Sequence, residues 1–146
     1  MRFLILFLFS SFTYSSLTWE TDIQKAKQIA HSEHKLILVN FSGSDWCGPC
    51  IRLRKEIFES DVFEKYAKDH LVLLNADFPR LKKNQLSKDQ QKKNDQLADS
   101  YNKDGAFPLT LLLNEDGKVI KKWDGLPKNS PAEFTNEINA LTDANK

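Results

Sequence analysis

The sequence predicts an α/β fold in which a central mixed β-sheet carries helices on both faces. Short apolar runs, typical of buried strands, alternate along the chain with segments of helical periodicity. A strand–helix–strand order then gives way to two strands joined by a tight turn, which combines parallel and antiparallel pairing in one sheet. The chain has 146 residues, 40% of them hydrophobic and 28% charged, and no internal repeat or long linker divides it. We therefore expect a single domain with a sizeable core.

The chain begins with a segment typical of a secretory signal peptide. Arg2 supplies a positive start, residues 3–9 form an unbroken apolar run, and residues 12–16 turn more polar. The run is well short of the roughly 20 residues that a membrane-spanning helix needs. We expect residues 1–16 to be a signal peptide and residues 17–146 to form the domain, with an uncleaved membrane anchor as the alternative. The protein would then be exported to the periplasm or the extracellular space.

The first half of the domain is expected to hold a helix, a central strand and two further helices. Residues 18–32 repeat apolar side chains at helical spacing. Residues 36–41 are apolar except for Asn40, as in a buried strand. Pro49 can open the next helix, and Ser60 can cap a short one after it. We expect these two helices to bury seven apolar side chains: Ile51, Leu53, Ile57, Phe58, Val62, Phe63 and Tyr66.

The second half is expected to hold a strand, a helix, a hairpin and a last helix. Residues 71–76 form an apolar run that Pro79 ends, and Ser87 with Gln90 fits a capping box that opens a helix to about Tyr101. Apolar runs at residues 109–113 and 119–123 flank the turn sequence Asn-Glu-Asp-Gly, which predicts a hairpin. The last helix is marked by a second capping box, a first-turn proline and an apolar stripe: Ser130 with Glu133, Pro131, and Phe134, Ile138 and Leu141.

Both cysteines of the chain lie in one pentapeptide, Trp46-Cys47-Gly48-Pro49-Cys50. Because the motif follows a strand and opens a helix, Cys47 would sit at the positive end of the helix dipole, which favours the thiolate. Cys50 is close enough to form a disulfide with Cys47 and to release whatever that thiolate has attacked. The chain-entropy model gives a loop of this size only about 2 kcal/mol of stabilisation. A disulfide between these cysteines would therefore stabilise the fold little and is better suited to reversible redox chemistry, even in an oxidising compartment.

Zinc and haem are the alternative uses of a Cys-x-x-Cys pair. A structural zinc site takes four ligands, and the sequence offers only three further candidates: His31, His34 and His70. Residue 51 is Ile51, so the attachment sequence of c-type haem is absent. We expect no metal and no cofactor beyond a redox-active Cys47–Cys50 disulfide. The net charge of +1 gives no argument for a nucleic-acid partner.

The pentapeptide resembles the active-site motif of the thioredoxin superfamily. Phe107-Pro108 resembles the cis-proline loop of that family, and Gly125 lies where a family glycine often follows the hairpin. The lead-in to Cys47, beginning at Phe41, is similar to that of exported thioredoxin-like proteins. The resemblance covers about residues 18 to 143. It implies a thioredoxin-like fold and thiol–disulfide oxidoreductase activity.

We expect Cys47 to be the accessible nucleophile and Cys50 the buried resolving thiol, with Gly48 and Pro49 fixing the geometry of the ring. By resemblance, the Gly-Pro pair favours a reductant over an oxidant.

Three other residues are expected to line the site. Trp46 would cover the thiols and offer an apolar face to substrate, or be a packing residue. If Pro108 follows a cis bond, the backbone of Phe107 would pair with an extended substrate like an added strand; otherwise Pro108 simply starts a strand.

Three residues depart from the family pattern. Asn40 stands near the position where thioredoxins bury an aspartate that accepts a proton from the second cysteine, and an amide cannot accept it. Leu73 lies where the lysine partner of that aspartate is often found, and Leu109 lies where a threonine usually follows the proline. Water or Asp45 would have to replace the missing carboxylate, unless Asp45 is only a solvated loop residue.

We expect an exported, monomeric oxidoreductase that reduces or isomerises disulfides of other exported proteins and receives electrons from an upstream thiol donor. Two alternatives stay open: a non-catalytic binding or chaperone module, and an electron relay to a single partner, for example in cytochrome maturation. Residues 80–93 carry six basic residues and one acidic residue, either as a solvated surface or as a docking site for an acidic partner. No second apolar segment is long enough to cross a membrane, so no membrane contact is expected after cleavage.

Overall fold

A computed structural model describes residues 17–145, so the predicted signal peptide lies outside the described residues. The strands are β1 (Trp19–Glu20), β2 (Leu36–Ser42), β3 (Leu71–Asp77), β4 (Leu109–Leu113) and β5 (Val119–Asp124). The helices are α1 (Ile23–Glu33), α2 (Gly48–Leu53), which runs on into a π-helical turn η1 (Arg54–Phe58), α3 (Asp61–His70), α4 (Lys88–Tyr101) and α5 (Pro131–Ala144). A short 3₁₀ turn, η2 (Lys82–Asn84), lies between β3 and α4.

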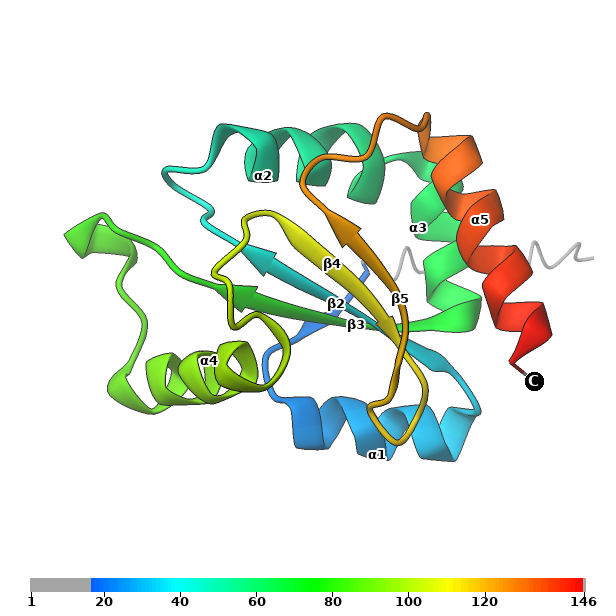
Figure 1. The fold of residues 1–146 in the computed structure, drawn as a ribbon, viewed down its shortest axis with the longest axis horizontal. Coiled ribbons are helices and arrows are strands. Elements are labelled where there is room, and N and C mark those ends of the chain that lie inside the picture. Colours follow the sequence, from blue (N-terminus) through cyan, green and yellow to red (C-terminus); the bar gives the residue numbers. More distant parts are fainter. Residues whose placement is uncertain (1–16, 146) are drawn as a thin grey trace, which may run out of the picture.

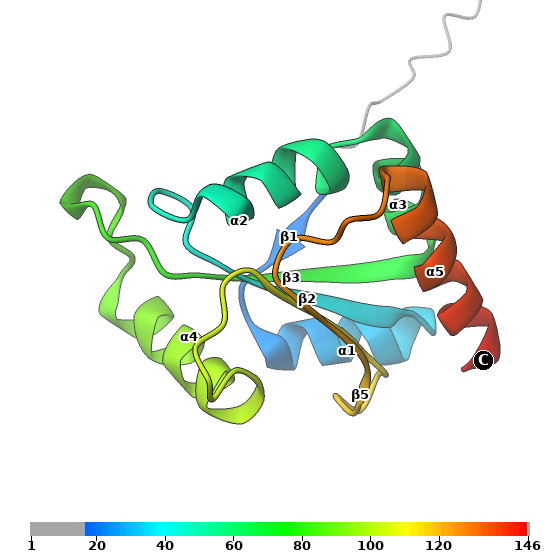
Figure 2. The same cartoon turned by 45° about the horizontal axis from the view of Figure 1, so that its top comes forward.

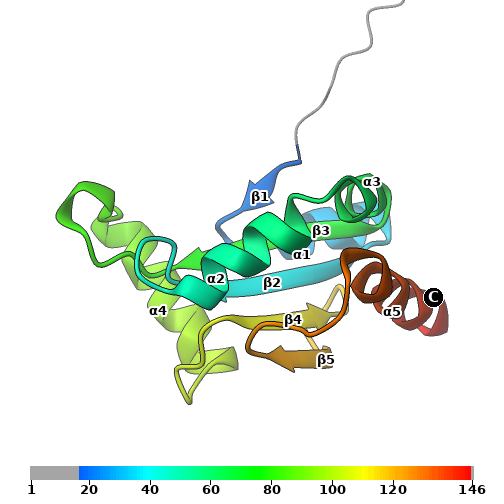
Figure 3. The same cartoon turned by 90° about the horizontal axis from the view of Figure 1, so that it is seen from above.

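The five strands form one mixed sheet in the order β1-β3-β2-β4-β5, which Figure 3 shows from above. β2 pairs in parallel with β3 and antiparallel with β4, so it occupies the centre. Because of this pairing, the carboxyl ends of β2 and β3 lie at the same edge of the sheet as the start of β4. The cysteine motif, the segment after β3 and Phe107-Pro108 therefore meet at that edge.

Helices cover both faces of the sheet, as predicted (Figures 1 and 2). Side chains alternate between the faces along each strand. Val39 and Phe41 of β2 pack with the buried residues of α1 and α4, whereas Leu36 and Leu38 pack with those of α2, η1, α3 and α5. Asn40 continues the second series, so its side chain points toward the face that α2 covers.

The start of the domain differs from the prediction. The sequence predicts a helix from residue 18, but Trp19 and Glu20 form a parallel edge strand beside Leu73 and Leu74. The ring of Trp19 packs on Phe58, with 5.3 Å between ring centroids. The helix begins only after Asp22, whose side chain accepts hydrogen bonds from the first backbone amides of α1.

The predicted burial is wrong for two residues of the second and third helices. Ile51 is 37% exposed and Val62 is 43% exposed, because each lies on the outer side of its helix. The other five residues of that set are buried or pack against the core: Leu53, Ile57, Phe58, Phe63 and Tyr66.

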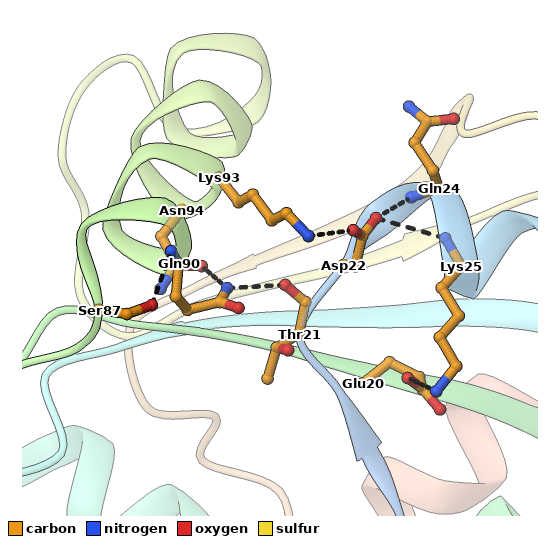
Figure 4. Close-up of polar contacts among 9 residues, drawn as sticks. All are labelled: Glu20, Thr21, Asp22, Gln24, Lys25, Ser87, Gln90, Lys93 and Asn94. Atoms are coloured by element: carbon orange, nitrogen blue, oxygen red, sulfur yellow. Dashed lines mark hydrogen bonds and ion pairs between the residues drawn. The ribbon is translucent and has the colours of Figure 1, made fainter.

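Of the two predicted capping boxes, only the one at α5 is complete. The Ser130 hydroxyl accepts from the amide of Glu133, whose carboxylate accepts from the amide of Ser130 in return. At α4, Ser87 accepts from the amide of Gln90, but the side chain of Gln90 turns away to the carbonyl of Thr21 (Figure 4). The hydrogen bond from Gln90 to Thr21 connects α4 with the segment that precedes α1.

Candidate active site

Cys47 and Cys50 form a disulfide at the start of α2, with their Cα atoms 5.2 Å apart. Cys47 is the N-cap of this helix, and its sulfur accepts a hydrogen bond from the backbone amide of Cys50 over 3.3 Å. Pro49 occupies the first turn, as expected from its fixed φ angle. After reduction the same amide and the helix dipole would stabilise a thiolate on Cys47.

The two cysteines differ little in exposure. Cys47 is 5% exposed and Cys50 is 3% exposed, so the predicted contrast between an accessible and a buried cysteine is nearly absent in the disulfide form. Gly48 and Pro49, which lie between them, are both exposed. Both cysteines of the disulfide are therefore nearly buried, although the two residues between them are exposed.

Trp46 is half-buried and held from several sides. Its indole Nε1 donates to the carbonyl oxygen of Phe78 over 2.7 Å, and its ring meets that of Phe107 edge-on, with centroids 5.5 Å apart. The guanidinium of Arg80 lies 3.6 Å from the ring centroid. A Cβ atom at Gly43 would collide with the indole of Trp46, so only glycine fits there. Trp46 thus connects the cysteine loop with the segments before β4 and after β3.

The Phe107-Pro108 peptide bond is cis, as the resemblance implies. The Pro108 carbonyl accepts from the amide of Gly125, whose φ of +79° favours glycine. The Phe107 ring contacts both Trp46 and Phe78. This loop therefore lies next to the cysteine loop, in contact with it through Trp46.

A chain of polar side chains lies on the face of the sheet that α2 covers. Asn40, only 5% exposed, donates to the side-chain oxygen of Asn75 over 3.1 Å and accepts from the hydroxyl of Thr110. The hydroxyl of Ser42 donates to Asp77 over 3.2 Å. Of this group, only Asn40 is predicted from the sequence to affect proton transfer at the site. The others could have been found from polar residues at alternate positions of apolar strands.

Asp45 is engaged by the segment after β3 instead of by the cysteines. Its carboxylate accepts from the backbone amides of Arg80 and Leu81 and from the side chain of Asn84, over 2.9 to 3.0 Å. The hydrogen bond from the Arg80 amide contributes most to lowering the pKa of this carboxyl group. A carboxylate that accepts three hydrogen bonds and has a lowered pKa is a poorer proton acceptor than a free one, which argues against Asp45 as the replacement for the missing aspartate.

The histidines lie elsewhere in the domain. His31 faces Glu115 and Asp116, and the ring of His70 stacks on Tyr66. Within residues 17–145 no three His, Cys, Asp or Glu side chains are arranged to hold a metal ion. In the same residues no helix has the length and apolar character to cross a membrane.

Comparison with known proteins places this arrangement in a family. A family model described as a thioredoxin-like domain matches residues 23–142. The chain belongs to the thioredoxin-like domain family. Among the relatives of this thioredoxin-like chain is the disulfide bond reductase DsbH of Chlamydia pneumoniae, 33% identical over 129 residues that are 87% of this chain and 74% of that protein. The thioredoxin-related protein DsbJ of the same organism is 32% identical over 105 residues, which are 72% of this chain but 29% of DsbJ.

Solved structures agree with this assignment. A structure described as DsbH oxidoreductase is similar to this thioredoxin-like domain with a TM-score of 0.79 and 29% sequence identity, covering 88% of this chain and 86% of the other. The predicted superfamily and the predicted α/β fold are thereby confirmed.

Proposed function

We propose that this protein is an exported thiol–disulfide oxidoreductase that reduces or isomerises disulfides of other exported proteins at Cys47 and Cys50. The observation that carries the proposal is the Cys47–Cys50 disulfide at the start of α2, beside the cis Phe107-Pro108 loop. The class of activity, predicted from the sequence, agrees with the names of the relatives, one a disulfide bond reductase and one a thioredoxin-related protein.

In the proposed reaction, two electrons pass from the protein to the substrate. The Cys47 thiolate attacks one sulfur of a substrate disulfide, and the other substrate sulfur leaves as a thiolate. Cys50 then loses its proton and attacks the Cys47 sulfur, which re-forms the Cys47–Cys50 disulfide and releases the second substrate thiolate. An upstream dithiol donor reduces the pair again. The Cα separation of 5.2 Å supports this cycle, because the two sulfurs can bond without backbone movement.

Water is the proton acceptor that we assign to Cys50. The amide of Asn40 cannot take a proton, and the carboxylate of Asp45 is occupied by the loop after β3. Resolution of the mixed disulfide would therefore be slower than with a buried carboxylate in place of Asn40.

The substrate is proposed to lie in extended form along the backbone of Phe107, held by Pro108, with Trp46 beside it. The contact between the rings of Trp46 and Phe107 supports this placement, since it brings the two loops together.

Residues 1–16 are proposed to be a signal peptide and residues 17–146 the mature, monomeric domain. The positive start, the short apolar run and the polar stretch after it support export.

Insulin reduction with dithiothreitol as electron donor tests the proposal. Wild-type protein should accelerate precipitation of the reduced insulin B chain, and Cys47→Ser should abolish the acceleration. In a separate incubation without dithiothreitol, reduced Cys50→Ala should form a stable mixed disulfide with insulin, which added dithiothreitol then releases. Thermal unfolding of each variant beside reduced wild type controls for misfolding.

Unchanged reduction by Cys47→Ser would contradict the enzyme and favour a binding or chaperone module. Poor insulin turnover by wild type, with one trapped partner in extracts of cells expressing Cys50→Ala, would instead favour a dedicated electron relay.

A further inference from the structure

The loop between β3 and α4 presents a set of cations that have no carboxylate partner. Arg80, Lys82 and Lys83 are all exposed, and none of them forms an ion pair with any residue of the described range 17–145. The arginines that follow the cysteines on the other side of the site behave differently, because Arg52 pairs with Glu56 and Arg54 with Glu59. We call Arg80, Lys82 and Lys83 the basic rim.

The basic rim is fixed to the cysteine loop. Three hydrogen bonds join the carboxylate of Asp45, two residues before Cys47, to Arg80, Leu81 and Asn84. The carboxylate of Asp45 thus bonds to N–H groups of the loop and not to the charged side chains of the rim. The rim carries three positive charges and Asp45 one negative charge, so two positive charges remain in excess. The loop lies beside the start of α2 in Figures 1 and 2.

Arg80 brings one of these charges onto the active-site tryptophan. Its guanidinium lies 3.6 Å from the centroid of the Trp46 ring, within the range of a cation–π contact. The sequence predicts that Trp46 offers an apolar face to substrate, whereas in the structure Arg80 covers one face of the ring. Since Trp46 also touches Phe107, a substrate strand beside Phe107 would lie within reach of Arg80.

We propose that the basic rim makes the enzyme prefer disulfides flanked by acidic residues. The inference rests on the proposed function and adds a substrate class to it. Arginine and lysine that lack a carboxylate partner attract carboxylates, and the planar fork of Arg80 suits two-pronged binding of a carboxylate. Complementary charge raises the rate of encounter more than the final affinity, so the preference should appear in the second-order rate constant.

Two model peptides test the preference. Each peptide contains one disulfide that closes a ring of the same sequence. The ring is flanked by three Glu residues in one peptide and by three Gln residues in the other. Reduced wild-type protein should react roughly three- to tenfold faster with the Glu peptide at low ionic strength, and the ratio should approach one in 0.5 M salt, a concentration chosen because it screens exposed charges. The triple variant Arg80→Gln, Lys82→Gln, Lys83→Gln should show a ratio near one at low salt.

A matched variant controls for net charge. Lys65→Gln, Lys68→Gln, Lys118→Gln removes the same charge from α3 and from the β4–β5 turn, and it should keep the wild-type ratio. The proposal would be overturned if the Glu-to-Gln rate ratio fell equally in both triple variants, or if the rim variant kept the wild-type ratio. A wild-type ratio of one together with binding to phosphatidylglycerol vesicles would overturn it in favour of a lipid-binding surface. Failure of the proposed function would look different, because neither peptide would then be reduced in a Cys47-dependent way.

Discussion

Asn40 occupies a position where a small change of chemistry would have a large effect. Its amide is buried beneath α2, and its two polar atoms bond to Asn75 and Thr110. The neighbouring strands thus satisfy its hydrogen-bonding groups without any charge. A neutral network of this kind costs little in the interior, whereas a carboxylate there would face burial without a cationic partner.

Asn40→Asp should speed resolution of the mixed disulfide, roughly tenfold at neutral pH, because a carboxylate can accept the Cys50 proton. Burial raises the pKa of the introduced carboxyl group, so the gain should vanish at low pH as that group becomes protonated. It should also shrink toward pH 9, where a free thiol, with a pKa of about 8.5, ionises unaided. The rate of resolution is measured by stopped-flow as the release of a labelled peptide from the mixed disulfide, from pH 6 to 9. Asn40→Leu is the uncharged control, and equal rates in all three proteins would remove this position from the mechanism.

At the scale of secondary-structure elements, the junction of α1 and α4 depends on one carboxylate, that of Asp22. Asp22 caps α1 through the amides of Gln24 and Lys25, and its other oxygen accepts from Lys93 of α4 over 2.6 Å (Figure 4). The hydrogen bond from Lys93 is the largest cause of the lowered pKa of Asp22. The first helix therefore begins at a residue that also anchors the fourth.

Asp22→Ala should lower the free energy of unfolding by about 1 kcal/mol at pH 7, the usual effect of losing an N-cap. Because the folded pKa of Asp22 lies below its ordinary value of 3.8, the ionised carboxylate stabilises the fold above that pH. The difference from wild type should thus shrink as the pH falls through the folded pKa. Urea unfolding at pH 7 and at pH 3 measures both points.

Asp22→Asn should retain most of the cap and lose only the pairing with Lys93. A difference between wild type and Asp22→Ala that is the same at pH 3 and pH 7 would contradict this account of the junction.

At the scale of the whole molecule, local patterns predicted most elements because each long strand or helix carries its own periodicity. The strand at Trp19 and Glu20 has only two residues, so no period could reveal it, and its pairing with β3 is a long-range contact. Asp22 was the available signal, since a capping residue there argues against a helix that starts at residue 18. The cysteine motif predicted the helix that it opens, but not that both cysteines would be nearly buried.

The surroundings of the site were harder to predict than the motif. The contacts of Arg80 with Trp46 and of Asp45 with the loop after β3 join residues about 35 positions apart, as their separations of 34 and 35 show. Local sequence holds no information on such pairs. The positive charge on the Trp46 ring is therefore a property of the folded molecule, although the basic composition of residues 80–93 could be read directly.

The reduction potential of the Cys47–Cys50 couple tests the central claim most directly. Equilibration of the protein in dithiothreitol and glutathione buffers, with the thiols counted by mass spectrometry after alkylation, gives the value. A reductase of this class should have a potential near −270 mV, about that of thioredoxin. A value near −120 mV, that of a strong oxidant, would contradict the account.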